Sequence, residues 1–332
     1  MRSSRLHAIS RLAALAAIAS VVLFAVACGS GGGSSSSPSP STSATSIDGA
    51  AITADPSLHA MVATDVVSPG VLRVASSFPY APWEYYNPST SKNMAGFDYD
   101  LARAIGAKLG LKTVYTDQVF DSLILSVIGH KDDMTMGDMY DNPQREKTLS
   151  FVDYAHDGEA LVVLHGNPSG ITNLDSLAGK TVGCLKGGAE EVLLDALNKE
   201  FKSSGKQQMH LLVLQLDPDG LLAMLGGKSD AQLMDQSAAA NLMKSSTGSK
   251  FEIITDPAAP NGYDPSTVGI GIAKANTQLV PAVQKALQAL IADGAYQKII
   301  GTYGLHAVTS AQTNQGGAET PQQWLATYKP AS

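Results

Sequence analysis

Short apolar runs alternate with segments of helical period along residues 71–245. Each run spans about five residues, and in the segment that follows it apolar positions return every three or four residues. Strands are predicted at Val71–Ala75, Lys112–Thr116, Thr181–Leu185, Leu211–Leu216 and Ala231–Met234, and helices at Phe97–Leu109, Asp121–Ile128, Glu190–Phe201, Gly220–Leu225 and Gln236–Ser245. This alternation predicts an α/β architecture with mainly parallel sheets, in which ligands bind where strand ends meet helix N-termini.

Three residues mark the predicted ends of the first two helices. Asp98 is predicted to cap the N-terminus of the helix that begins at Phe97, because a carboxylate accepts hydrogen bonds from free backbone N–H groups. Gly110 and Gly129 each follow the last apolar position of a helical segment, where glycine commonly ends a helix.

Two of the connections are candidate anion sites. Asn142-Pro143-Gln144-Arg145 places a cap residue and a first-turn proline beside a guanidinium, so free N–H groups and a cation lie together. Lys186-Gly187-Gly188-Ala189 offers small residues that let an anion approach the backbone. The alternatives are a surface arginine in a first turn and a plain glycine turn, and the acidic pair Glu190-Glu191 weakens the second site.

The N-terminus has the layout of an export signal. Arginines at positions 2, 5 and 11 precede an apolar run from Leu12 to Ala27, which is shorter than the roughly 20 residues of a membrane-spanning helix. Ala25-Val26-Ala27-Cys28 resembles the lipobox of bacterial lipoproteins, although Ala25 replaces the usual leucine. We therefore expect a signal peptide over 1–27 and lipidation of Cys28; an ordinary cleavage site after Ala27 is the alternative.

A low-complexity segment follows Cys28. Gly29–Ser46 consists almost wholly of Gly, Ser, Pro and Thr, a composition that behaves as a flexible spacer, and 28–69 is predicted as an anchored linker and N-terminal segment. If Cys28 is acylated, Cys184 is left without a disulfide partner. Its apolar run predicts a buried thiol, not a reactive one.

Composition and missing motifs exclude several functions. The net charge is −7 and the basic residues are scattered, which argues against a surface for nucleic acid or anionic lipid. Sequence signatures of hydrolases, nucleotide-binding loops and zinc peptidases are absent, so we expect no cofactor and no metal. His130, His165 and His210 are expected at the surface, and Asp132-Asp133 is expected to be a solvated pair, not a catalytic one.

Seven segments between Arg73 and about Leu305 resemble, in order, the family 3 extracellular solute-binding proteins, the polar amino-acid receptors of ABC importers. The segments are Phe78–Glu84 (FPYAPWE), Gly96–Ala102 (GFDYDLA), Arg145, Leu149–Tyr154 (LSFVDY), Leu174 through Gly179–Gly183 (GKTVG), Asp230-Ala231 ahead of Asp235, and Ala292–Ile299 (ADGAYQKI). Each segment is weak evidence by itself, but seven in order are specific.

The resemblance implies a two-lobed, periplasmic-binding-protein-like fold of type II, in which two α/β lobes joined by a hinge close on the ligand. Lobe 1 would comprise 70–160 plus 268–305, lobe 2 would comprise 161–267, and 306–332 would form a C-terminal tail. Arg145 matches the arginine that pairs with the ligand's α-carboxylate. Asp235 matches the aspartate that accepts the α-ammonium group, so the two lobes would read the two charges of an amino acid.

The same resemblance extends the site to further residues. Tyr80 or Trp83 would form an aromatic wall, with core packing as the alternative for both, and Phe120 would form an apolar wall opposite. Gly137 and Asp138 match a stretch that hydrogen-bonds the ligand. Glu84 is expected to be a structural acid.

Five positions depart from the family pattern. Gly188-Ala189 stands where hydroxyl residues are usual, so only backbone N–H groups would serve the carboxylate there. Ser77 stands where receptors for cationic amino acids often carry aspartate, whereas Asp138 and Tyr140 replace small residues on the other wall. An acidic wall disfavours glutamate and aspartate as ligands, because unpaired like charges repel.

The expected function is that of an extracytoplasmic substrate-binding lipoprotein. It would capture an amino acid or similar polar solute, pass it to an ABC permease, act as a monomer and be anchored to the cell membrane through Cys28. One alternative is an enzyme of the same fold, similar to periplasmic cyclohexadienyl dehydratases, for which Asp138 is the only surplus acid or base. Another is a ligand sensor that docks on a partner protein.

Overall fold

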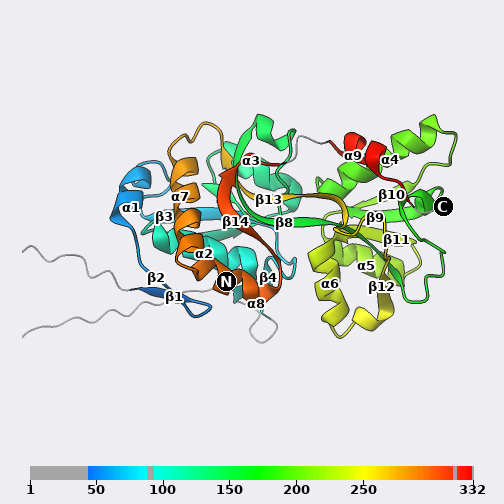
Figure 1. Ribbon diagram of the computed structural model, residues 1–332, viewed down its shortest axis with the longest axis horizontal. Helices are drawn as coiled ribbons and strands as arrows, with labels where there is room; N and C mark the ends of the chain where they lie inside the picture. The colour runs from blue at the N-terminus through cyan, green and yellow to red at the C-terminus, as the bar shows by residue number, and fades with distance from the viewer. Residues whose placement is uncertain (1–43, 88–92, 317–319, 331–332) are drawn as a thin grey trace, which may run out of the picture. The chain divides into compact units, whose positions relative to one another are not determined.

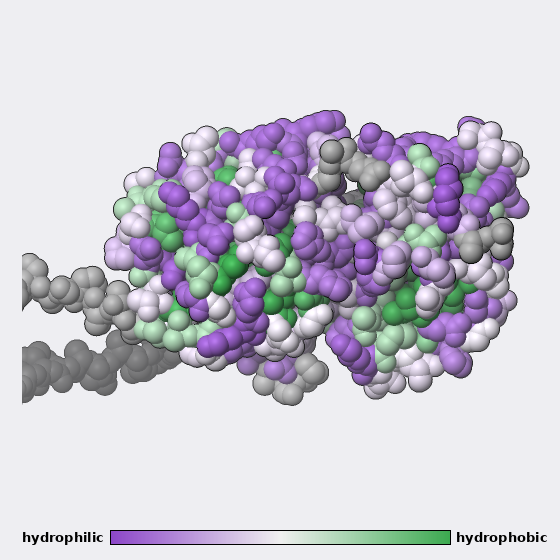
Figure 2. Space-filling view, viewed as in Figure 1, coloured by the Kyte–Doolittle hydropathy of each residue, from purple (hydrophilic) through white to green (hydrophobic). Residues whose placement is uncertain are grey.

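The computed structural model describes residues 44–87, 93–316 and 320–330 (Figure 1). The predicted signal peptide, Cys28 and most of the spacer lie outside the described residues. Within the described part of the chain, no helix is long and apolar enough to cross a membrane. Figure 2 shows hydrophilic residues spread over the viewed face.

Lobe 1 is built on parallel strands that are covered by helices. Its strands β3 (Val71–Ser76), β6 (Lys112–Asp117) and β7 (Met134–Thr135) pair in parallel, with β3 in the middle. The helices α2 (Phe97–Lys108), α3 (Leu123–Ile128), α7 (Leu279–Ala292) and α8 (Ala295–Tyr303) accompany them, and a small β4 (Tyr85–Tyr86) and β5 (Met94–Ala95) pair lies beside α2. Apolar residues of α2, α7 and the strands form one buried cluster.

Lobe 2 repeats the parallel arrangement with its own core. Strands β10 (His210–Leu214) and β11 (Ala231–Asp235) flank β9 (Thr181–Leu185), and both pair with it in parallel. Its helices are α4 (Ala189–Ser203), α5 (Asp217–Leu225) and α6 (Gln236–Lys244). Leu161, Val182 and Leu233 belong to a cluster separate from that of lobe 1.

Two long strands connect the lobes. β8 (Leu149–Leu164) and β13 (Tyr263–Ala273) pair antiparallel and run from one lobe into the other (Figure 1). β8 continues into lobe 2, where it pairs antiparallel with β11 and β12 (Phe251–Ile253), so all these strands form one hydrogen-bonded sheet. The parallel pairing predicted within each lobe is confirmed, and the crossing strands add the antiparallel pairs. The lobe limits at 160/161 and 267/268 stay predictions.

Residues before and after the family-like region are also folded. β1 (Thr45–Ile47), β2 (Ala50–Ile52) and α1 (Pro56–Val62) contribute buried side chains to the core of lobe 1. The spacer predicted to reach Ser46 therefore ends before β1, because alternate positions there are apolar and packed. We also find that the predicted tail is structured: β14 (His306–Thr313) pairs with β8, whereas α9 (Pro321–Thr327) packs on α4 in lobe 2.

Two expectations about individual acids are wrong. Asp98 lies inside α2, whose N-cap is Gly96, and its Oδ2 accepts the backbone N–H of Asp138 at 3.0 Å. Asp132 and Asp133 are buried, not solvated, because they accept hydrogen bonds that join neighbouring segments: Asp132 from Ser126 and Asp133 from Arg73.

The three histidines and the free thiol lie as expected. His130, His165 and His210 are exposed. Cys184 is buried in β9, and burial raises the pKa of its thiol, so the reactive thiolate form is disfavoured.

Candidate functional site

A cavity lies where the two lobes face each other. Its walls come from loops that follow strands of both lobes, as expected for an α/β fold. The lining residues are Ser77, Pro79, Tyr80, Glu84, Phe120, Gly137, Asp138, Tyr140, Arg145, Leu185, Gly188, Ala189, Glu190, Leu216, Asp217 and Asp235. Every predicted ligand-binding residue is among them except Trp83.

Arg145 reaches across the cavity from lobe 1. Its Nη1 donates to the carbonyl of Tyr140 at 2.6 Å, and its Nη2 donates to the carbonyl of Gly187 in lobe 2 at 2.9 Å. The guanidinium lies over the ring of Phe120, 5.5 Å from its centre. Among the described residues, no carboxylate oxygen lies within 4.0 Å of its nitrogens. A guanidinium has five N–H donors, so Arg145 keeps donors for an incoming carboxylate.

The segment before Arg145 differs from the predicted helix start. Arg145–Lys147 is one turn of 3-10 helix, and Asn142 Oδ1 already accepts the backbone N–H groups of Gln144 and Arg145 at 3.1 and 2.9 Å. The free backbone donors expected here are therefore occupied. The anion-binding capacity of this segment rests on the guanidinium alone.

The glycine loop of lobe 2 is also partly filled by the chain itself. Gly187 N–H donates to Glu191 Oε2 at 2.6 Å, and Leu185 N–H donates to Glu190 Oε1 at 3.0 Å. The N–H of Gly188 donates to the carbonyl of Leu185 at 3.2 Å. Carboxylates in the first turn of a helix can accept free N–H groups, so Glu191 occupies one donor of the predicted anion site and Glu190 occupies the donor just before it.

Asp235 faces Arg145 from the other lobe. It ends β11 directly before α6, and its Oδ2 accepts a hydrogen bond from the hydroxyl of Tyr80 at 2.5 Å. The side chain is 7% exposed, and burial raises its pKa. An ammonium group beside Asp235 would favour the ionised carboxylate and reverse this shift.

Carboxyl groups outnumber cations in the cavity. Glu84, Asp138, Glu190, Asp217 and Asp235 line it, whereas Arg145 is the only Lys, Arg or His among the lining residues. Burial raises the pKa of Asp217 to about 7 and raises those of the other four as well. The described part of the chain places no Lys, Arg or His nitrogen within 4.0 Å of these five carboxyl groups.

Sequence reasoning missed three of these acids as lining residues. Glu84 is predicted to be a structural acid, and Glu190 is predicted only to weaken the nearby anion site. The sequence prediction gives no role to Asp217. Asp217 had a usable signal, because it follows the predicted strand that ends at Leu216, and the ends of parallel strands meet at the ligand site.

The two aromatic candidates have different environments. Tyr80 is half-buried and lines the cavity. Trp83 is fully buried: its ring packs edge-on against Tyr154 at 6.2 Å and beside Phe97 at 5.8 Å, and its Nε1 donates to Ser237 Oγ at 2.8 Å. Because its indole is enclosed by the core, Trp83 does not form a wall of this cavity, and the core alternative holds for it.

Comparison with known proteins places the chain in a family. Residues 72–306 match the model of the bacterial extracellular solute-binding proteins, family 3. The lysine/arginine/ornithine-binding periplasmic protein of Escherichia coli K12 is 29% identical over 238 residues, 71% of this chain and 88% of that protein. The arginine-binding extracellular protein ArtP of Bacillus subtilis is 28% identical over 231 residues, 69% of this chain and 84% of that protein.

A solved structure agrees. An ancestral arginine-binding protein bound to arginine superposes with a TM-score of 0.62 at 28% identity, covering 70% of this chain and 98% of the other. A second solved structure, an ancestral amino acid-binding precursor of cyclohexadienyl dehydratase, superposes with a TM-score of 0.60 at 23% identity and so shows the fold alone. The chain therefore belongs to the bacterial extracellular solute-binding proteins of family 3 and has the two-lobed α/β fold of the periplasmic amino-acid-binding proteins.

Proposed function

We propose that this protein captures a basic amino acid, such as arginine or lysine, between its two lobes. The observation that carries this proposal is the charge of the cavity, where five carboxyl groups surround one guanidinium. A ligand with one carboxylate and two cationic groups complements this arrangement. Glutamate and aspartate would add a further unpaired negative charge. The relatives whose names specify arginine, lysine or ornithine support the same ligand class.

Each ligand charge has a partner in this proposal. Arg145 receives the α-carboxylate through its remaining N–H donors, and Asp235 receives the α-ammonium group. The side-chain cation lies toward the acids that remain, with Tyr80 and Phe120 as its aromatic and apolar walls. Ser77, Gly137, Tyr140, Gly188 and Ala189 also line the cavity.

Calorimetric titration with matched ligands tests the proposal. We expect L-arginine or L-lysine to bind, L-glutamate to bind at least about a hundredfold more weakly, and agmatine, which lacks the carboxylate of arginine, to lose most of the affinity. Arg145→Ala and Asp235→Ala should each cost about 2–5 kcal/mol, or about 30-fold to several thousand-fold in affinity, because each leaves a desolvated ligand charge unpaired. A loss within threefold for both variants would sink the amino-acid assignment.

The two variants also distinguish other ligand classes. A loss confined to Arg145→Ala would indicate a carboxylate without an amine, and a loss confined to Asp235→Ala would indicate an amine or guanidino compound. Mass spectrometry of a small molecule that copurifies with the protein would then name the ligand.

We further propose that the protein works as a monomeric binding component that delivers its ligand to an ABC permease and has no catalytic activity. The named relatives are binding proteins, which supports this role. Asp138 is the candidate general acid or base among the cavity acids that are not assigned to an α-group of the ligand, so turnover of the bound ligand that Asp138→Asn abolishes would overturn this role.

The proposed anchor is a lipid on Cys28. The apolar run from Leu12 to Ala27, the small residues before Cys28 and the Ser/Gly spacer after it support lipidation and attachment to the cell membrane. The test compares wild type with Cys28→Ser after cell fractionation. Wild type should sediment with membranes and the variant should be released; wild type already in the aqueous fraction would contradict the anchor.

A further inference from the structure

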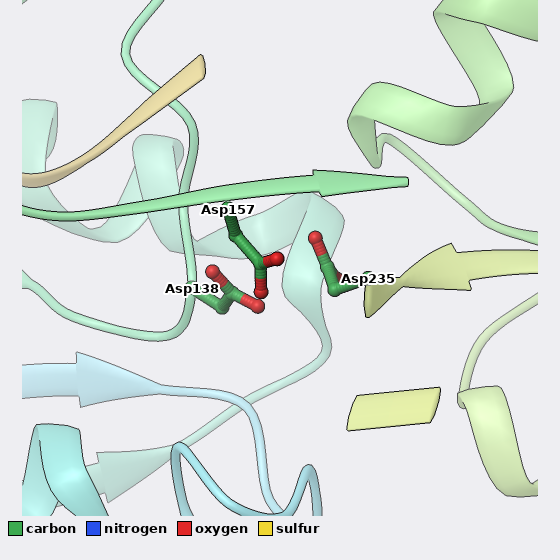
Figure 3. A group of neighbouring side chains, drawn as sticks. All are labelled: Asp138, Asp157 and Asp235. Carbon is green, nitrogen blue, oxygen red and sulfur yellow. The ribbon is translucent and has the colours of Figure 1, made fainter. Parts of the chain in front are cut away.

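Three carboxylates converge beside the cavity from three parts of the fold. Asp138 follows β7 in lobe 1, Asp157 lies on the crossing strand β8, and Asp235 ends β11 in lobe 2. One oxygen from each lies within 4.8 Å of an oxygen of the other two. Figure 3 shows Asp138 and Asp157 extending toward each other, with Asp235 beside them at the end of β11.

Among the described residues, no N–H or O–H group donates to the Asp138 side chain, whereas the other two carboxyl groups of the cluster accept such hydrogen bonds. The side chain is 5% exposed, and the carboxyl group of Asp235 lies within hydrogen-bonding reach of it. Its backbone is held by the bond from its N–H to Asp98 and has a φ of 48°, in the left-handed region. Asp157, by contrast, accepts the N–H groups of Gly158 at 2.8 Å and Ser237 at 3.3 Å. A buried carboxyl group that the fold holds against other carboxyl groups, with no donor from the fold, is suited to bind a cation.

The Arg145 guanidinium acts on Asp235 across the cavity, but it does not pair directly with the cluster. Glu84, Asp98 and Glu159 add further buried carboxyl groups nearby, and they raise the charge density. In the part of the chain that the structure describes, no Lys, Arg or His nitrogen lies within 4.0 Å of Asp138, Asp157 or Asp235. Three carboxylates at this spacing ionise together only when a cation lies among them.

We propose that Asp138, Asp157 and Asp235 form a binding site for a divalent metal cation, with Ca²⁺ as the expected ion. All donors are oxygens, which favours a hard cation such as Ca²⁺ over a soft one. Three oxygens that lie no more than 4.8 Å apart always leave a point within about 2.8 Å of all three, close to the Ca–O range of about 2.3–2.6 Å. The sequence carries no motif for this site, because the three ligands come from separate segments of the chain.

The site shares Asp235 with the proposed amino-acid function but does not depend on it. A divalent cation at the cluster competes with the ligand's ammonium group for the same carboxylate. Because its ligands come from lobe 1, the crossing strand and lobe 2, the bound cation also holds these three parts together. Affinity in the range of extracellular calcium modules, a Kd of about 10⁻⁴–10⁻³ M, fits three carboxylates without a dedicated loop.

Terbium luminescence provides a direct measurement of this site. Tb³⁺ replaces Ca²⁺ at oxygen sites, and the ring of Tyr80, hydrogen-bonded to Asp235, lies where it can sensitise the ion. We expect saturable luminescence that Ca²⁺ displaces. Asp157→Asn and Asp138→Asn should each weaken Tb³⁺ binding about tenfold or more, because each removes one charged ligand while keeping the side-chain shape. Two variants are used so that a folding defect in one, detected by circular dichroism, leaves the other as a test.

Asp153→Asn is the matched control. Asp153 is also buried and also lies beside a second acid, Asp141, but outside the cluster, so this variant should keep the wild-type Tb³⁺ affinity. Absence of saturable binding up to about 10 mM Ca²⁺, tenfold above the expected range, would overturn the proposal. An equal loss of Tb³⁺ affinity in Asp153→Asn would also overturn the proposal, because the ion would then be attracted by the overall negative charge and not bound by the three carboxylates.

The experiments can distinguish a failure of the metal site from a failure of the proposed amino-acid function. Tb³⁺ binding without any amino-acid binding would remove the proposed function and leave the metal site. Calorimetric binding of arginine with no Tb³⁺ signal would do the reverse. For an amino acid shown to bind by calorimetry, a saturating concentration should lower the Tb³⁺ affinity, and an unchanged affinity would contradict the shared use of Asp235.

Discussion

The hydroxyl of Tyr80 donates a 2.5 Å hydrogen bond to Oδ2 of Asp235, and this bond joins residues that are 155 positions apart in the sequence. Tyr80 belongs to lobe 1 and Asp235 to lobe 2, so the contact both orients the carboxylate and links the lobes. Arg145 makes a second link of this kind through its bond to the carbonyl of Gly187. The residues assigned to the ligand's charges are thus also contacts between the lobes.

Tyr80→Phe should weaken amino-acid binding about 5- to 30-fold, since it removes one hydrogen bond to a charged group while keeping the aromatic wall. Titration calorimetry measures this loss. Tyr86→Phe is the control, because Tyr86 makes a similar bond to Asp117 at 2.6 Å but lies outside the cavity. An affinity within twofold of wild type for Tyr80→Phe would show that this bond does not orient Asp235 for the ligand.

Trp83→Ala should lower the free energy of unfolding by about 3–5 kcal/mol, because it empties a fully buried position between Phe97 and Tyr154. Urea denaturation measures the change, and Tyr80→Ala, at a half-buried position, should cost less stability. Trp83→Phe should retain most of the stability. A Trp83→Ala protein of normal stability that has lost ligand affinity would return Trp83 to the ligand wall.

The stability of the ligand-free protein should fall as pH rises from about 4 to about 8. Burial raises the pKa of both Asp157 and Asp217 from an ordinary value of 3.8 to about 7. Between these values the folded state keeps protons that the unfolded state has lost, so its stability is highest at the acidic end and declines up to the folded pKa. Melting temperatures measured across this range test the direction.

Binding of a cationic ligand should show the opposite trend with pH. Ionised carboxylates bind the cation, so the ligand displaces protons from the cavity and its affinity should rise between about pH 5 and pH 8. Calorimetry in two buffers of different ionisation enthalpy counts the released protons. Affinity that is flat over this range would mean that the cavity acids are already ionised in the free protein.

Leu325→Ala should destabilise lobe 2 by about 2–5 kcal/mol although it lies beyond the family-like region. Leu325 is buried against α4, and its neighbour Trp324 stacks on Tyr328 at 5.1 Å, while the hydroxyl of Tyr328 donates to the buried Asp256. Gln322→Ala, on the exposed side of α9, is the control. Equal melting temperatures for the two variants would show that α9 adds no stability.

The sequence by itself determined the local elements and singled out Arg145 and Asp235, two of the charged residues that line the cavity. β3, α2 and β9 begin and end within one or two residues of their predicted limits, because apolar period, glycine positions and turn residues act over short distances. Arg145 and Asp235 were found because each lies within a segment whose order and spacing resemble a known family.

Only the tertiary structure decided which residues that are distant in the sequence lie close together. Contacts between elements bury Trp83 and direct Glu190 onto the N–H of Leu185. They also bring Asp157 close to Asp138 and Asp235. A single sequence carries no local signal for such contacts. The docking of the C-terminal α9 on lobe 2 is of the same kind, because the partner surface of α4 lies more than a hundred residues earlier in the chain. Side-chain period predicts that a face is buried, whereas the choice of its partner depends on packing across the whole fold.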